Sequence, residues 1–371
     1  MRHAATVNLT EERGSHNRGA HAPNTGTGTM INGELIDLVA GDYEARIASS
    51  GAMLVHLRRQ GRDLIMPFDA EATLPAGWQG KTLLPWANRI AGSRYDYAGT
   101  EFLVGCNEPA SGSALHGLAG WMDWQVADDD PSGPDDGAPR SRVVLELSLL
   151  ASYGYPWSLE ASACFELDAE RGLSVTVTAT NVGAARPAPP VPGAPEVKGE
   201  PAPAPYGVSC HPYLTRSVPL DDCVLTIPAA EVLDVDEHMA PTHRRSVEGT
   251  HWDWRGGRLV GATQTDNAYT ALPEGTWEVS LRGGQGNRAV VMSSDVPWVQ
   301  AYTADELSRP GVAIEPMTCP PNAFNSGEDL IALKVGQSHS FTYRLHEVAL
   351  STSIGPMVTV CSGPMSTRRP A

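Results

Sequence analysis

The chain has 371 residues, of which 43 are acidic and 27 are basic, so its formal net charge is -16. A surface of that sign repels phosphate backbones, and nucleic-acid binding is therefore not expected. A hydrophobic fraction of 41% supports a real core and excludes wholesale disorder. The sequence has no run of about 18 apolar residues, so we expect no transmembrane helix and no membrane partner.

The N-terminal segment, residues 1–33, is polar and lacks any alternating pattern. Because it offers little apolar surface to bury, we expect a disordered extension. It also lacks the apolar middle region of a signal peptide, which makes the cytoplasm the expected location. The six cysteines are dispersed, with no CxxC pair, and are interpreted as individual thiols.

Residues 34–347 consist of short apolar runs separated by Gly, Pro, Asn and Asp, a pattern typical of strands and turns. No helical stripe of ten residues is present. We therefore expect one all-β domain, and so many strands require packed antiparallel sheets, as in a large β-sandwich. The strands that alternation or apolar runs predict most clearly are residues 142–150, 173–180, 277–281, 288–292 and 341–345.

Three segments depart from this pattern. Residues 128–140 are acidic and rich in turn formers, and residues 183–205 are dominated by Pro and Ala. The second segment could link two domains, but strand-like sequence of the same style on both sides favours a long surface loop within one domain. Residues 348–371 are predicted to be a loose tail.

Glu315 and His211 share one local sequence setting. Glu315 follows the apolar run 311–314 and His211 follows the run 206–210, and each precedes a proline. Pro316 is expected to end the strand that leads to Glu315, because proline has no N–H for ladder pairing. A carboxylate where a buried strand ends, facing a cleft, has a raised pKa and can act as a general base near neutral pH. An imidazole titrates near neutrality and can give and take protons. Taken alone, Glu315 could also face solvent, and His211 could be a structural histidine.

His116 precedes Gly117 in a loop where the backbone can approach a ligand closely. His116, His211 and Glu315 could together form a metal-binding facial triad. Their separation along the chain offers no HxH or HxxxH spacing, so we expect no metal.

Asn88 and Arg89 follow Trp86, and an amide, a planar guanidinium and an aromatic ring face together suit sugar hydroxyls. Arg89 could equally bridge two loops. Asp266 lies in an Asp-Asn pair, which is frequent in turns for local reasons. Trp298 and Tyr302 could stack on a sugar or belong to a core strand.

In their order along the chain, these segments resemble the aldose 1-epimerase (mutarotase) family. Asn88-Arg89 is similar to the family's asparagine–arginine segment. Leu115-His116-Gly117 resembles its first histidine motif and Cys210-His211-Pro212-Tyr213 its second. The most specific part is the run from Glu315 through Pro320-Pro321-Asn322 to Asn325.

The resemblance implies a galactose mutarotase-like β-supersandwich that interconverts the α and β anomers of free aldohexoses such as glucose or galactose. It implies that Glu315 is the general base and His211 the general acid. It further implies that Asn88, Arg89, His116 and Asp266 bind the substrate. The expected partner is a small aldose, with no cofactor, and the expected oligomeric state is a monomer or homodimer.

Three alternatives stay open at this point. An epimerase for hexose 6-phosphates needs extra basic residues, for which only Arg89 and Arg94 are candidates. A catalytically silent sugar-binding module on the same fold would need neither Glu315 nor His211. A glycosidase could use Glu315 and Asp266 as its carboxylate pair.

Overall fold

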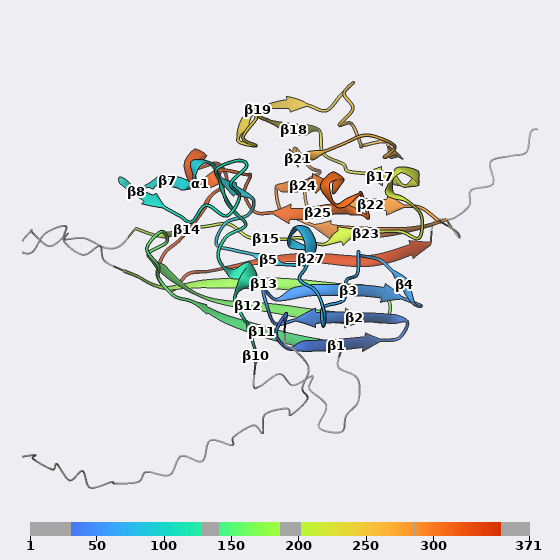
Figure 1. The fold of residues 1–371 in the computed structure, drawn as a ribbon, viewed down its shortest axis with the longest axis horizontal. Helices are drawn as coiled ribbons and strands as arrows, with labels where there is room; N and C mark the ends of the chain where they lie inside the picture. The colour runs from blue at the N-terminus through green and yellow to red at the C-terminus, as the bar shows by residue number, and fades with distance from the viewer. Residues whose placement is uncertain (1–30, 128–140, 186–201, 285–286, 350–371) are drawn as a thin grey trace, which may run out of the picture.

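The computed structural model describes residues 31–127, 141–185, 202–284 and 287–349, and most of their regular structure is β-strand (Figure 1). The strands pair antiparallel throughout the three large sheets. Helical structure in these residues is limited to short turns, so the predicted all-β fold is confirmed. The helical elements are α1 (Ala323–Ser326) and the 3-10 turns η1 (Ala76–Trp78), η2 (Ala91–Ser93), η3 (Ala119–Trp121), η4 (Leu220–Asp222) and η5 (Asp305–Leu307).

The largest sheet has nine strands and contains all five segments for which strands were predicted most clearly. Along its long central strands, buried apolar residues alternate with exposed or half-buried polar ones, which is the pattern of a sheet with one solvated face. In spatial order the strands are β10 (Gln125–Val126), β11 (Arg142–Leu149), β12 (Trp157–Asp168), β13 (Gly172–Ala184), β27 (Ser338–Ala349), β23 (Arg288–Ser294), β22 (Trp277–Arg282), β17 (Val224–Thr226) and β20 (Arg258–Leu259).

A second sheet of eight strands carries the chemistry described below. Its central strand, β25, is buried at every position, as expected for a strand covered on both faces. In spatial order the strands are β19 (Pro241–Ser246), β18 (Glu231–Val235), β21 (Asp266–Thr270), β24 (Trp298–Tyr302), β25 (Val312–Met317), β15 (Ser209–Cys210) and β5 (Thr82–Leu83), with β16 (Tyr213–Leu214) also paired to β25.

The remaining strands form a four-stranded sheet and three two-stranded pairs. The four-stranded sheet comprises β1 (Leu35–Ala40), β2 (Tyr43–Ala48), β3 (Met53–Arg59) and β4 (Arg62–Asp63). The pairs are β6 (Arg89–Ile90) with β9 (Ala114–Leu115), β7 (Arg94–Tyr97) with β8 (Thr100–Leu103), and β14 (Ala204–Tyr206) with β26 (Ile331–Leu333).

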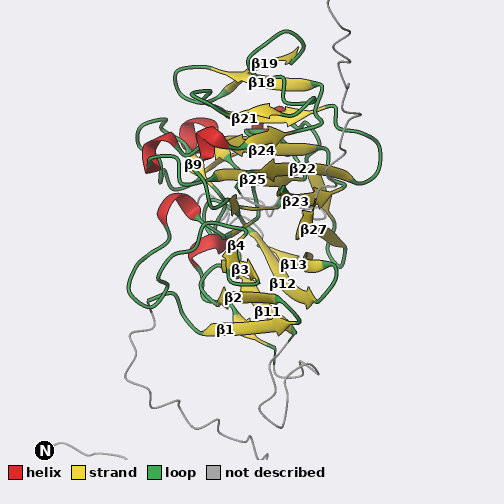
Figure 2. Ribbon diagram, turned by 90° about the vertical axis from the view of Figure 1, so that its right-hand side faces the viewer, coloured by secondary structure: helices red, strands yellow, loops and turns green. Residues whose placement is uncertain are grey.

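One hydrophobic core joins these sheets. Ile47 of β2, Val175 of β13 and Ile314 of β25 belong to the same contiguous cluster of buried side chains. Figure 2 shows β1–β3 beside β11–β13 at one end of the molecule and β21, β24 and β25 at the other. This packing of antiparallel sheets is the predicted sandwich architecture.

Several predicted boundaries shift. The Pro/Ala-rich loop predicted over 183–205 is shorter at both ends, because β13 runs to Ala184 and β14 begins at Ala204. Residues 348 and 349, predicted to belong to a loose tail, are instead the end of β27. Of the predicted segments, residues 1–30, 128–140, 186–201 and 350–371 lie outside the described residues. Residues 31–33 were predicted to belong to a disordered extension, but Asn32 is buried and its Nδ2 donates to the carbonyls of Ala70 and Thr73.

The expectation that Pro316 ends the strand is wrong, because β25 continues through it to Met317. On the β24 side the ladder is intact, with Val299 opposite Pro316. On the other side, the N–H of Ile314 donates to Pro212 and the N–H of Thr318 to Val208. By this alternation the proline nitrogen, which carries no hydrogen, faces the gap between these bonds, where no ladder bond is lost.

Candidate active site

All six predicted site residues line one cavity of about 370 Å³. They come from five segments that are distant in sequence and that the eight-stranded sheet and the β6–β9 pair bring together. The residues are Asn88, Arg89, His116, His211, Asp266 and Glu315.

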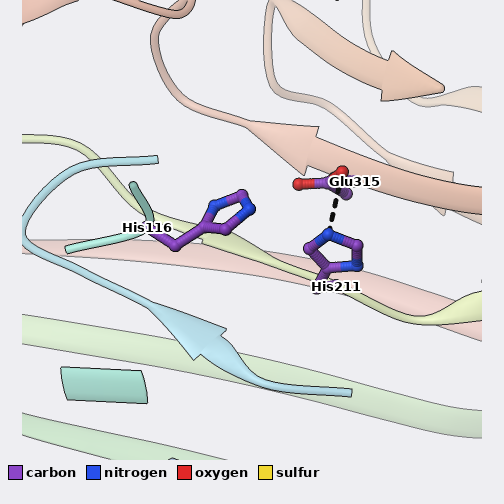
Figure 3. A group of neighbouring side chains, drawn as sticks. All are labelled: His116, His211 and Glu315. Atoms are coloured by element: carbon purple, nitrogen blue, oxygen red, sulfur yellow. Dashed lines mark ion pairs between the residues drawn. The ribbon is translucent and has the colours of Figure 1, made fainter. Parts of the chain in front are cut away.

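Glu315 was predicted at a strand end, but it lies within β25, opposite Gln300 of β24. Its side chain is buried, with 2% of the residue exposed. One carboxylate oxygen, Oε1, is 3.3 Å from Nε2 of His211 (Figure 3). The other, Oε2, is buried and has no hydrogen-bond partner among the described residues. The carboxyl group is therefore held by the strand but left with an unused acceptor.

His211 directly follows β15, as predicted, although the apolar run before it divides into the two strands β14 and β15. Its backbone is fixed on both sides, because its N–H donates to Lys81 and its carbonyl accepts from Gly80. The ring stacks on Tyr213, with centroids 5.1 Å apart and planes at 27°. These contacts hold the imidazole against Glu315 without occupying Nε2.

His116 follows β9, and its ring meets that of His211 edge to face, with centroids 5.1 Å apart (Figure 3). The backbone here is tightly fixed. His116 itself has φ of 63°, and its N–H donates to the carbonyl of Asn88. A Cβ atom on Gly117 would lie 2.2 Å from the carbonyl oxygen of Leu84, so only glycine fits behind the histidine.

Arg89 begins β6 and is held by a carboxylate that the sequence analysis missed. Glu108 accepts from Arg89 Nε at 2.7 Å and from Nη2 at 2.8 Å, a bidentate pair. Asp266 lies 3.7 Å from the same guanidinium. Asn88 is buried, and its Oδ1 accepts from the Arg89 N–H. Glu108 precedes a proline, as Glu315 does, and that setting was the one signal that could have revealed it.

Asp266 begins β21 and is linked to the Glu315 strand through Gln300. The Gln300 Nε2 donates to Asp266 Oδ1 at 2.6 Å, and Gln300 is the cross-strand neighbour of Glu315. The Gln300 Oε1 is buried without a partner among the described residues. The Asp-Asn pair is therefore at the start of a strand rather than in a turn.

Burial is the main influence on the charges of this site. Burial raises the pKa of Glu315 well above its usual range, and the negative charge of Asp266 adds to that effect while Arg89 opposes it. Burial lowers the pKa of His211 to about 3, with a further contribution from Arg89. Burial also lowers the pKa of His116 well below its ordinary value, assisted by His211 and Arg89. The site therefore favours neutral imidazoles and a protonatable carboxyl group.

The aromatic wall differs from the expectation. Trp86 packs in the core against Phe324 and does not line the cavity. Trp78 of η1 lines it instead, with its ring edge against His116 at a centroid distance of 5.0 Å. Of the two residues of β24 that were left open, Tyr302 lines the cavity and Trp298 is fully buried. A lone tryptophan in a turn carries no periodicity, so the sequence offered no signal for Trp78.

His116, His211 and Glu315 each offer one ligand atom, and these atoms all lie within 4.8 Å of one another. Two imidazoles and a carboxylate are a set that can hold a divalent transition metal. The same three groups can also carry out proton transfer, because an imidazole beside a carboxyl of raised pKa supplies both an acid and a base.

No helix in the described part of the chain is long and apolar enough to cross a membrane.

Comparison with known structures shows the same architecture. A galactose 1-epimerase from Lactobacillus acidophilus NCFM matches with a TM-score of 0.68 at 16% identity, over 85% of this chain and 94% of the other. An aldose epimerase homologue from C. elegans matches with a TM-score of 0.71 at 19% identity, over 86% and 99%. At these identities the likeness establishes the fold, and it confirms the predicted galactose mutarotase-like class.

Comparison of sequences identifies the family as well as the fold. The protein named uncharacterized protein YihR of Escherichia coli (strain K12) is 36% identical over 321 residues, which cover 86% of this chain and 95% of that protein. The family model described as aldose 1-epimerase matches residues 34–192 and 195–346, nearly all of the described chain. The chain therefore belongs to the aldose 1-epimerase family.

Proposed function

We propose that this protein interconverts the α and β anomers of a free aldohexose such as glucose or galactose. The observation that supports the proposal is the buried pair of His211 Nε2 and Glu315 Oε1, 3.3 Å apart in a cavity lined by hydrogen-bonding side chains. Opening a hemiacetal ring requires one base at the anomeric hydroxyl and one acid at the ring oxygen. The pair carries one proton, which burial places on Glu315 in the free protein. It supplies both functions in the tautomer with that proton on His211, as carboxylate and imidazolium.

In the proposed reaction Glu315 takes the proton of the anomeric hydroxyl, and His211 donates a proton to the ring oxygen as the bond between that oxygen and C1 breaks. The open-chain aldehyde turns about the bond between its first two carbons. Reclosure on the other face reverses both transfers, so Glu315 returns its proton and His211 regains its own. The protein ends in its starting protonation state, and no covalent intermediate forms.

The other four residues are proposed to bind the sugar. His116 and Asn88 are buried beside the pair, and Arg89 and Asp266 lie against each other on the cavity wall. A guanidinium and a carboxylate offer donors and acceptors for vicinal hydroxyls. Their mutual contact at 3.7 Å leaves both with capacity for a further hydrogen bond.

The composition of the wall favours a neutral sugar over a hexose 6-phosphate. Among the described residues that line the cavity, Arg89 is the one Lys or Arg, and Glu108 already occupies two of its donors. The wall also carries Glu237, Asp266 and Glu306, whose charges would repel a phosphate.

Polarimetry tests the proposal. Crystalline α-D-glucose or α-D-galactose is dissolved in chelator-treated buffer, and the decay of optical rotation is followed with and without the protein. We expect an acceleration that is proportional to protein concentration. Binding of these sugars without acceleration would replace the proposal by the silent sugar-binding module. A strong preference for a 6-phosphorylated hexose would replace it by the hexose-phosphate epimerase.

A further inference from the structure

We infer that His116, His211 and Glu315 also bind a single divalent transition-metal ion of the zinc class, and that this ion excludes the sugar and inhibits the enzyme reversibly. The inference rests on the proposed function for its inhibitory consequence, because ion and sugar would compete for the same acid and base. The binding itself does not depend on that function.

The spacing of the three groups is the first argument. Their ligand atoms lie within 4.8 Å of one another, and His211 Nε2 is 3.3 Å from Glu315 Oε1. Two ligands of a tetrahedral zinc ion with bonds of about 2.0–2.1 Å are roughly 3.3 Å apart. Two of the three ligands therefore already have the separation that the ion requires. Figure 3 shows the ring of His116 beside this pair, where a third ligand would stand.

The charge of the surroundings is the second argument. Arg89 is the nearby cation, and its charge is balanced by a bidentate pair with Glu108 and by Asp266 at 3.7 Å. Glu306 adds a further carboxylate to the wall of the same cavity. A cleft with an excess of carboxylates raises the local concentration of cations.

The outer contacts of the histidines argue for an inhibitor rather than a resident cofactor. In resident metal sites the second ring nitrogen of a ligating histidine donates to a carboxylate, a carbonyl or water. Here Nδ1 of His116 and Nδ1 of His211 have no partner among the described residues. We therefore expect reversible binding that a chelator removes. The cavity leaves the fourth coordination position to water, as in open zinc sites.

Binding is tested with the metal alone. Co²⁺ is titrated into the full chain and its visible absorption recorded, because four-coordinate Co²⁺ with nitrogen ligands absorbs far more strongly than the hexaaqua ion. Zn²⁺ affinity is then measured in competition with a chromophoric chelator. We expect one strongly absorbing Co²⁺ ion to bind per chain and Zn²⁺ to displace it. Saturating galactose should weaken the binding of Co²⁺. In the variant His116→Gln we expect Zn²⁺ affinity to fall at least tenfold.

The control variant is His243→Gln. His243 is exposed, lies outside the cavity and is paired with Asp234 at 2.7 Å, so it should leave the affinity of the inferred site unchanged. Equal Zn²⁺ affinity in wild type and His116→Gln would overturn the inference. A Co²⁺ spectrum identical to that of the free ion would also overturn it. This measurement uses the wild-type protein and so does not depend on whether a variant folds.

Activity separates the inference from the proposed function. We expect Zn²⁺ to raise the KM for the sugar with little change in kcat, and a chelator to restore the original rate. Mutarotation that Zn²⁺ does not affect would sink the inference and leave the proposed function standing. Loss of activity on treatment with chelator would also overturn it, because the ion would then be required. Metal binding without any mutarotation would leave the site intact and refute the proposed function.

Discussion

Two buried glutamates on neighbouring sheets differ in almost everything except burial. Glu315 and Glu347 are exposed by 2% and 3%, respectively. The carboxylate of Glu347 contacts Arg62 at 2.8 Å, Arg216 at 3.1 Å and Arg288 at 3.2 Å. The carboxylate of Glu315 contacts one imidazole at 3.3 Å and has Asp266 as a charged neighbour.

Their pKa values move in opposite directions for this reason. Burial acts to raise the pKa of Glu347, but hydrogen bonds from Arg62 and Arg216 outweigh it, and the pKa is lowered. Burial raises the pKa of Glu315, and the charge of Asp266 raises it further. Burial alone therefore does not make a carboxylate reactive. What matters is whether guanidinium groups or a proton-exchanging neighbour surround it.

The largest effect is expected from Glu315→Gln, which keeps the shape of the side chain and removes the base. We expect the catalysed rate of mutarotation to fall by about 10²- to 10⁴-fold, the usual contribution of a positioned acid or base. Folding should be preserved, because the amide removes a carboxyl group that burial disfavours in its charged form. Polarimetry measures the rate and circular dichroism the fold. A variant that folds and retains the wild-type rate would refute the assigned role of Glu315.

The matched substitution Glu347→Gln is expected to act on stability instead. It leaves the guanidinium of Arg216, whose side chain is 3% exposed, without its carboxylate. Breaking one partner from such a buried pair costs about 3–5 kcal/mol of unfolding free energy, while the partly exposed Arg62 and Arg288 remain screened by solvent. Urea denaturation measures the loss, and the catalysed rate per folded molecule should be unchanged.

The difference in unfolding free energy between wild type and Glu347→Gln should depend on pH in a definite direction. The folded-state pKa of Glu347 lies below the ordinary 4.5, so its contribution is complete above pH 4.5 and is lost as the pH falls through the lower folded value. The gap in stability between wild type and Glu347→Gln should therefore narrow as the solution is acidified. A gap that stays constant would mean that the ion pairs do not carry it.

A smaller effect is expected from Glu108→Gln. This change leaves the guanidinium of Arg89 without its bidentate carboxylate partner, so Glu315 has a less compensated guanidinium nearby and its surroundings become more like those of Glu347. A hydrogen bond to a charged group contributes about 1.5–3 kcal/mol, so kcat/KM should fall on the order of tenfold to a hundredfold. Most of the change should be in KM, because Arg89 is proposed to position the sugar. Glu101→Gln, which breaks the exposed Arg94–Glu101 pair outside the cavity, is the control.

The sequence allowed a good prediction of the β fold, and the six residues that it proposed for the site line one cavity. Alternation was clear over residues 173–180 because that strand has one buried and one solvated face. It was absent from β5, β15 and β16, which are two residues long and so too short for any period. These short strands position His211, so its surroundings could be known only from the structure.

The partners of the site residues could not be predicted, for a different reason. Glu108 and Gln300 hold Arg89 and Asp266 through contacts between distant segments. The proline after Glu108 is a local signal but does not identify Arg89 as its partner, and Gln300 has no local signal. Pro316 misled the prediction, because proline was taken to end the strand when it occupies a position between the hydrogen bonds donated by Ile314 and Thr318, where β25 needs no donor. Local patterns identify strands and candidate groups, whereas pairing partners depend on tertiary geometry.

The smallest effect is expected on the pH profile, and it bears most directly on what distinguishes Glu315 from Glu347. Catalysis requires one proton on the pair of His211 and Glu315, so activity should fall at alkaline pH when the pair loses it. The negative charge of Asp266 raises the pKa of Glu315 and Arg89 lowers it. Asp266→Asn should therefore move the alkaline limb to lower pH, and Arg89→Gln should move it to higher pH.

Both variants will also bind sugar less well, but a loss of binding lowers the whole profile without displacing its limbs. The displacement is read from kcat/KM against pH, which reports the free enzyme and excludes shifts caused by bound substrate. Opposite displacements in the two variants would show that fixed charges on the cavity wall tune the acid–base pair. Displacements in the same direction, or none, would show that burial alone sets the pKa of Glu315 and that Asp266 acts only on the sugar.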